Sequence, residues 1–255
     1  MPNFRICSLL LLLLSLSPAP FLSAIAGEKV NKSYLGKAPM YQMLQSGAKA
    51  NIILFSGGPG WWGNLKSKNF LIRERKALFS KGLNVFLFPN KKKKYKMTYE
   101  DRLEDNHISR IRKLVKDIRT QNDLPIILAG ISRGTVSVGK FISKYGSEVN
   151  GAILLSGIYI NSEITKKNDY SMQRVIGTSA ATNILVQHHE DDCCKVCQPF
   201  SAKQFFNDLE INSKTLQMIS GGGASGSCNG PFHYHGFEGV EDQVVKKLVS
   251  WIESL

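Results

Sequence analysis

The stretch Gly130-Ile131-Ser132-Arg133-Gly134 decides the fold of this chain. It follows the short apolar run 125–129 and precedes a segment whose apolar residues recur at roughly helical spacing. This succession predicts a strand, a sharp turn and a helix. A serine at the apex of such a turn adopts a strained backbone conformation that projects its hydroxyl above the sheet, and glycines on both sides prevent clashes. Ser132 is therefore the candidate nucleophile.

Several more short apolar runs alternate with helical stretches along the chain. The runs occupy residues 51–55, 84–88, 151–155, 183–186 and 215–219. Apolar side chains share one helical face in 108–118, and an apolar residue recurs every four positions in 240–252. Continuous apolar runs are typical of buried parallel strands. We therefore expect one α/β domain with a mostly parallel central sheet, helices on both faces and room for a short antiparallel edge strand in 28–50.

The first 26 residues have the character of a secretory signal peptide. Arg5 supplies a positive start, Leu9 to Leu14 form an unbroken apolar run, and Ala24-Ile25-Ala26 is a small-x-small cleavage signal. This predicts an exported protein, periplasmic or secreted, whose mature domain is 27–255.

A membrane anchor is the alternative for the N-terminal segment. Residues 6–27 carry no charge and have about the length of a bilayer span. Pro18 and Pro20 interrupt the stretch and favour a cleaved signal peptide.

Four cysteines remain in 27–255: Cys193, Cys194, Cys197 and Cys228. An even number in an exported protein indicates disulfides. Because a bond between the neighbours Cys193 and Cys194 would strain the backbone, we expect Cys228 to pair with one of the three upstream cysteines. Such a bond closes a ring of about 35 residues and stabilises the fold by about 3 to 4 kcal/mol.

The chain is strongly basic, with a net charge of +13. Lys91 to Lys94, with Lys96, form a cluster that would attract an anionic cell-envelope surface or another polyanion. We favour a solvated loop instead, and no nucleic-acid partner, because aromatic residues do not alternate with these lysines as they do in a nucleic-acid groove.

Ligands of such sheets collect at the carboxyl ends of the strands. The run 51–55 leads into the glycine-rich turn 56–60, and Pro59 within it lacks an N–H. We expect the backbone N–H groups of Gly58 and of Arg133, which follows the nucleophile, to form an oxyanion hole.

Two later loops supply the remaining side chains of a triad. Asp192 is the first choice for the acid and Asp191 the second, because both follow the run 183–186. His235 is preferred to His233 as the base because the adjacent Gly236 permits close backbone approach. The resulting order Ser, Asp, His is that of α/β-hydrolases.

The chain resembles the α/β-hydrolase superfamily and, more narrowly, a poorly characterised group of small exported bacterial serine hydrolases. The resemblance rests on four stretches, 56–60, 69–73, 130–135 and the pair 188–194 with 228–237. It implies a Cys194–Cys228 disulfide that holds Asp192 near His235. The turn 57–60 is also similar to that of proline iminopeptidases, but Ser56 stands where those carry histidine.

The resemblance and the chemistry of these groups imply an esterase-like hydrolase that cleaves an acyl ester through an acyl-enzyme, without metal or organic cofactor. Only the short segment 157–182 separates two strands, so we expect no large lid and a small-molecule acyl substrate. Two alternatives remain. One is a catalytically silent binding protein for an anionic surface polymer. The other is a metal-dependent hydrolase using the cluster 188–197, which is rich in His, acidic residues and Cys.

Overall fold

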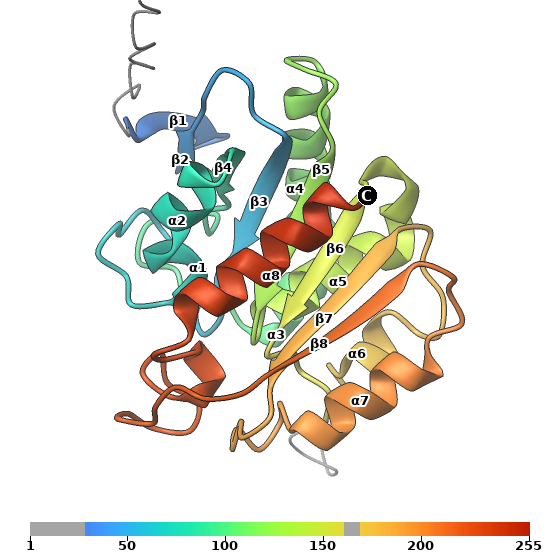
Figure 1. Ribbon diagram of the computed structural model, residues 1–255. Coiled ribbons are helices and arrows are strands. Elements are labelled where there is room, and N and C mark those ends of the chain that lie inside the picture. The colour runs from blue at the N-terminus through green and yellow to red at the C-terminus, as the bar shows by residue number, and fades with distance from the viewer. Residues whose placement is uncertain (1–28, 161–168) are drawn as a thin grey trace, which may run out of the picture.

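The computed structural model describes residues 29–160 and 169–255. They form an eight-stranded sheet with the strand order β1-β2-β4-β3-β5-β6-β7-β8 (Figure 1). The strands are β1 Asn31–Leu35, β2 Ala38–Met43, β3 Ala50–Phe55, β4 Leu83–Leu87, β5 Ile126–Ile131, β6 Gly151–Leu155, β7 Asn183–His189 and β8 Lys214–Ile219. From β4 to β8 all neighbours are parallel, while β2 pairs antiparallel with β4, and β1 with β2.

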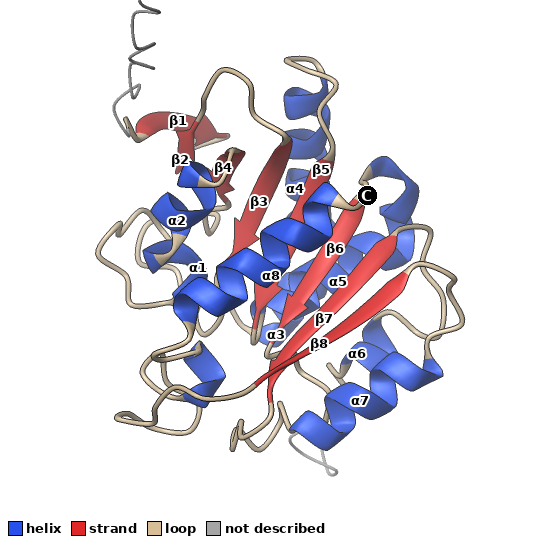
Figure 2. Cartoon of the chain, in the orientation of Figure 1, coloured by secondary structure: helices blue, strands red, loops and turns tan. Residues whose placement is uncertain are grey.

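Helices cover both faces of the sheet (Figure 2). They are α1 Phe70–Arg73, α2 Arg75–Ser80, α3 Tyr99–Leu103, α4 Asp105–Arg119, α5 Gly134–Tyr145, α6 Met172–Val175, α7 Pro199–Asp208 and α8 Glu241–Glu253. Helices α1, α2 and α8 pack on one face, and α4 to α7 pack on the other. Successive residues of β3 alternate between the two cores, because side chains of a strand point alternately to its two faces.

The expected α/β architecture is confirmed. All six predicted runs are strands, and the apolar faces of 108–118 and 240–252 are buried in α4 and α8. The N-terminal edge holds two antiparallel strands rather than one, because Gly36, with φ of +64°, turns the chain back after β1.

Two sequence predictions concern regions that lie wholly or partly outside the described residues. The predicted signal peptide lies outside the described residues. In the connection between β6 and β7 the described residues form one short helix, α6, while residues 161–168 are also outside the described part. None of the described helices combines the length and apolar character needed to cross a membrane.

Helix α5 begins in direct contact with the backbone of β3. A Cβ atom on Gly134 would lie 2.1 Å from the carbonyl oxygen of Phe55. We therefore predict that Gly134→Ala destabilises the fold by at least about 2 kcal/mol, since rigid backbone has to move. Ser143→Ala, at an exposed position of the same helix, is the matched control and should stay within about 0.5 kcal/mol of wild type. Urea unfolding followed by circular dichroism measures both, and equal stabilities would contradict the prediction.

Candidate functional site

Ser132 lies in a strained turn between β5 and α5. Its φ is +52°, a conformation that residues other than glycine rarely adopt, and its N–H donates to the Leu155 carbonyl at 2.9 Å. A Cβ on Gly130 would lie 2.6 Å from the Gly134 carbonyl oxygen, so the glycines on both sides are sterically required. The strand, turn and helix predicted from this stretch are present.

The glycine-rich turn 56–60 lies against this serine. A Cβ on Gly57 would be 3.0 Å from the Cβ of Ser132. Gly58 has φ of +53°. In the described part of the chain, the N–H groups of Gly58 and Arg133 donate to no acceptor. Two free donors beside the serine are what an oxyanion hole requires.

A buried arginine, Arg102, holds the glycine-rich turn by hydrogen bonds to its backbone carbonyls. Arg102, only 2% exposed, donates to the carbonyls of Ser56 at 3.2 Å and Gly58 at 3.1 Å, and to the hydroxyl of Ser137 at 3.1 Å. Burial lowers the pKa of its guanidinium to about 9, so Arg102 is still a cation at neutral pH. Arg102 could not be recognised from the sequence, because a lone arginine in a helix gives no signal of burial.

His235 is held in a short 3-10 helix, Tyr234–Gly236, after β8. A Cβ on Gly236 would lie 2.3 Å from the Pro231 carbonyl oxygen, which confirms the close backbone approach expected there. Arg73 of α1 anchors the loop by donating to the carbonyls of Pro231 at 2.9 Å and Gly236 at 2.8 Å. The segment 69–73, known from the sequence only by resemblance, therefore positions the histidine loop.

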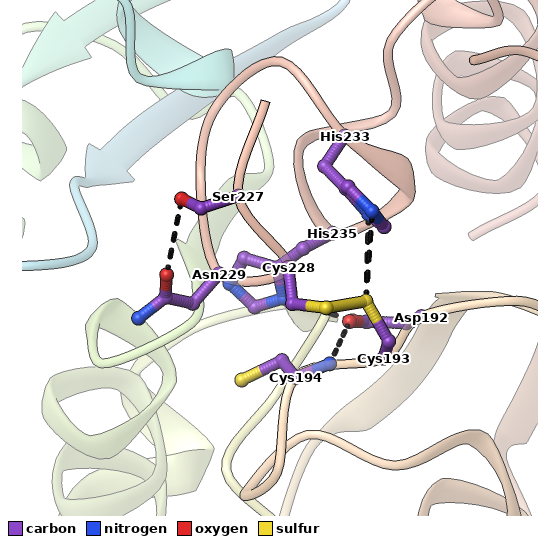
Figure 3. Close-up of a disulfide and its surroundings, with 8 residues drawn as sticks. All are labelled: Asp192, Cys193, Cys194, Ser227, Cys228, Asn229, His233 and His235. Atoms are coloured by element: carbon purple, nitrogen blue, oxygen red, sulfur yellow. Dashed lines mark hydrogen bonds and ion pairs between the residues drawn. A yellow bond between two sulfur atoms is a disulfide. The ribbon is translucent and has the colours of Figure 1, made fainter. Parts of the chain in front are cut away.

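Asp192 is the carboxylate that meets this histidine. His235 Nδ1 and Asp192 Oδ2 are 2.8 Å apart, and Asp192 is 3% exposed. Asp191, the alternative acid, has a side chain that is 65% exposed and lies near His189 instead. His233 also points elsewhere, toward the sulfur of Cys193 (Figure 3).

The contact with Asp192 stabilises the charged form of the His235 imidazole. Burial alone would lower the pKa of His235, but the hydrogen bond and charge of Asp192 outweigh it and raise that pKa above 6.5.

Ser132 and His235 line one cavity of about 270 Å³, together with Gly57, Gly58 and Trp62. The structure thus brings the predicted serine, imidazole and carboxylate to one edge of the sheet. No direct hydrogen bond joins Ser132 to His235 among the described interactions. Such contacts are commonly long in unliganded sites and tighten when substrate binds.

The disulfide joins Cys193 to Cys228, with 5.2 Å between the Cα atoms (Figure 3). Pairing of Cys228 with an upstream cysteine is confirmed, but the choice of Cys194 was wrong. Residues alternate along this loop, so that Asp192 and Cys194 are buried and Cys193 is exposed. The N–H of Cys194 donates to Asp192 Oδ1 at 2.9 Å, which commits Cys194 to the inner side.

Cys194 and Cys197 are free, buried thiols near Asp192 and His235. A hydrogen bond with Cys197 lowers the pKa of Cys194 to about 6, and the charge of His235 acts in the same direction. Burial raises the pKa of Cys197, and the Ser132 hydroxyl interacts with that thiol.

The histidines of the proposed metal cluster 188–197 are otherwise engaged. Nε2 of His188 is 2.6 Å from the Cys197 carbonyl oxygen, and Nε2 of His189 is 2.7 Å from that of Gly221. Within the described residues, neither histidine belongs to a group with metal-ligand spacing.

The lysine cluster, Lys91 to Lys94, lies exposed in the loop after β4, as expected for a solvated loop. Lys91 lies 3.7 Å from the carboxylate of Asp101 and over the ring of Tyr95. The cluster is outside the cavity that holds Ser132.

No family model and no curated protein sequence matches the chain. Solved structures do. A soluble variant of monoglyceride lipase from Saccharomyces cerevisiae, in complex with a substrate analogue, has a TM-score of 0.60 and 15% identity, and the match covers 94% of this chain and 98% of the lipase. A thermophilic esterase from Thermogutta terrifontis with butyrate bound has a TM-score of 0.59 and 13% identity, covering 88% of this chain and 92% of the esterase.

A sugar hydrolase from Lactococcus lactis has a TM-score of 0.63 and 14% identity, with 89% of this chain and 98% of that chain covered. At such identities the likeness shows the fold alone. The chain has the α/β-hydrolase fold, which confirms the fold expected from the sequence, and its structural neighbours are lipases, esterases and other hydrolases.

A buried histidine, His107, lies beside Ser137, which is one of the hydrogen-bond partners of Arg102. The Ser137 hydroxyl accepts from Arg102 and lies 2.9 Å from His107 Nε2. Burial, and then the charge of Arg102, lower the pKa of His107 to about 3. Because that folded value lies below 6.5, the stability contributed by neutral His107 is complete above pH 6.5 and is lost as the pH falls toward 3.

We predict that this group alone removes roughly 3 kcal/mol of unfolding free energy between pH 6.5 and pH 4. His107→Gln keeps an acceptor for Ser137 but does not titrate, so its stability should fall less steeply over that range. Urea unfolding at several pH values measures both proteins. Parallel curves for the two would show that His107 is not the titrating group.

Proposed function

We propose that this protein is an exported serine hydrolase that cleaves acyl esters through Ser132, His235 and Asp192. The observation that carries the proposal is the buried hydrogen bond of 2.8 Å between His235 and Asp192 at the cavity that also contains the strained Ser132. A carboxylate that fixes one imidazole nitrogen leaves the other directed at a nucleophile.

The proposed reaction uses groups already on this chain. His235 takes the proton of Ser132 while the hydroxyl oxygen attacks the ester carbonyl, and Asp192 stabilises the imidazolium that forms. The N–H groups of Gly58 and Arg133 bind the oxyanion. His235 then gives the proton to the leaving alcohol, and water, activated by the same histidine, releases the acid from the acyl-enzyme.

A short acyl group is the substrate class we favour. The cavity of about 270 Å³ lies just below the usual range of ligand sites, which begins at about 300 Å³, and Trp62 and Phe70 contribute apolar surface to it. The esterase from Thermogutta terrifontis holds butyrate, which is consistent with this choice.

Export is supported by the N-terminal sequence and by the Cys193–Cys228 pair, since disulfides persist in oxidising compartments. We assign the protein on this basis to the small exported bacterial hydrolases that its motifs resemble, in the periplasm or outside the cell.

The first test is covalent labelling. A fluorophosphonate probe should modify Ser132 of the wild-type protein, as identified by peptide mapping. Ser132→Ala should abolish both labelling and hydrolysis of short acyl esters. Ser156→Ala is the matched control, because Ser156 is also a buried serine with positive φ, of +41°, and should keep the label. Labelling of a residue other than Ser132 would contradict the proposed nucleophile. Absence of any labelling, together with no hydrolysis of a range of acyl esters, would favour the catalytically silent binding protein.

The second test is the pH profile. Because the pKa of His235 is raised and the base must be neutral, kcat/KM should rise with pH through an apparent pKa above 6.5. Asp192→Asn should reduce kcat by about 10⁴-fold, since an amide facing Nδ1 imposes the wrong tautomer. Asp191→Asn, one residue away and exposed, should remain within a few fold of wild type. Equal losses in both variants would refute the assignment of the acid.

A further inference from the structure

Two free thiols and the proposed catalytic imidazole form a cluster that ester hydrolysis does not require. The sulfurs of Cys194 and Cys197 and a ring nitrogen of His235 all lie within 4.8 Å of one another, and all three residues are buried. We propose that these three residues form a binding site for a thiophilic divalent cation of the zinc type, and that the bound cation switches the hydrolase off.

The backbone prepares this ligand set. Cys194 and Cys197 have the Cys-x-x-Cys spacing, and the N–H of Cys197 donates to the Cys194 carbonyl at 3.0 Å, which closes a tight turn. The Cys194 sulfur points away from the Cys193–Cys228 disulfide (Figure 3). Tetrahedral zinc needs sulfur and nitrogen ligands about 3.5 to 3.8 Å apart, so small side-chain rotations complete the geometry.

Asp192 would orient His235 as a metal ligand in the same way that it orients His235 as a base. Histidines that bind metals usually donate their other ring N–H to a carboxylate, which fixes the tautomer. Here Nδ1 of His235 meets Asp192, so Nε2 is the nitrogen left for the cation.

Charge and access both suit a cation. On binding, the two thiols and any protonated His235 release protons to solvent, so two thiolates, a neutral imidazole and a divalent cation together carry no net charge, and the Asp192 carboxylate remains beside them as an anion. Cys194 borders a second cavity, of about 800 Å³, which provides a route from solvent. The other sulfur cluster, Cys193 and Cys228 with His233, is closed by its disulfide.

Inhibition follows from the shared nitrogen. A cation bound to Nε2 of His235 takes the lone pair that would accept the Ser132 proton. This consequence rests on the proposed function, whereas cation binding does not.

The binding test uses the mature protein with its disulfide intact and two free thiols, both verified by mass spectrometry after alkylation. Anaerobic titration with Cd²⁺ should produce thiolate-to-cadmium absorption that saturates at one equivalent. Cys194→Ser, Cys197→Ser and His235→Gln should each weaken binding by more than about 100-fold, since loss of an outer partner alone costs 10- to 100-fold. His233→Gln is the matched control and should bind as wild type does.

Absence of the absorption in protein with two verified thiols would overturn the site. So would absorption that persists unchanged in both cysteine variants, and binding that survives His235→Gln would remove the histidine from the ligand set. These readouts need no enzyme activity, so they remain informative if the protein is not a hydrolase.

The inhibition test measures ester hydrolysis with Zn²⁺. Saturating Zn²⁺ should lower the wild-type rate by about 100-fold, the scale of a general base, and a chelator should restore it. Cys194→Ser should raise the half-inhibitory Zn²⁺ concentration by more than about 100-fold, in line with its weaker binding. Full activity at Zn²⁺ concentrations that saturate the site would overturn the switch while leaving the proposed hydrolase intact.

Discussion

The buried hydrogen bond between Asp192 and His235 is the interaction on which the site depends, because it joins two loops that are 43 residues apart. A single bond between loops is weak, since its net contribution is about 1 kcal/mol and two flexible segments have to be ordered. Three further contacts share that task. The Cys193–Cys228 bond links the loops covalently, the Cys194 N–H fixes the carboxylate, and Arg73 clamps the carbonyls around the histidine. The precision of the pair therefore comes from backbone constraints on both sides of it.

The glycine-rich turn 56–60, which also lines the cavity, is held by a buried cation, Arg102. A cation buried as deeply as Arg102 has a desolvation cost that neutral partners repay only in part, and its Nε has no partner among the described residues. Its two carbonyl acceptors, however, belong to the turn that supplies the free N–H of Gly58. These two hydrogen bonds hold the turn in place on both sides of the peptide group that carries the Gly58 N–H. The arginine is better explained by positioning than by stability.

The sequence predicted most of the sheet and where its chemistry lies. Apolar runs and the Ser132 turn are local signals, because steric limits on a strand, a sharp turn and a helix act over a few residues. The choice of Asp192 over Asp191, left open by position alone, depends on which side of the loop each residue faces. The incorrect prediction of a Cys194–Cys228 disulfide has the same cause. Cys193 and Cys194 are adjacent, and only the alternation of inner and outer residues, set by tertiary packing, assigns one to Cys228. Arg102 gave no signal, and Arg73 entered only through the resemblance of the stretch 69–73, because the carbonyls that both arginines hold are backbone groups, which any sequence provides.

That alternation also explains why one loop serves several purposes. Asp192 and Cys194 face inward together, and the turn returns Cys197 to the same side, so a carboxylate and two thiols converge on His235. An imidazole fixed by a carboxylate is equally suited to accept a proton and to bind a soft cation, because both need the same free lone pair. A proton and a metal ion are then competitors for one nitrogen. Because Cys193 and Cys228 are joined in the disulfide, their sulfurs are not available to bind a metal ion. Cys194 and Cys197 are then the free thiols near His235.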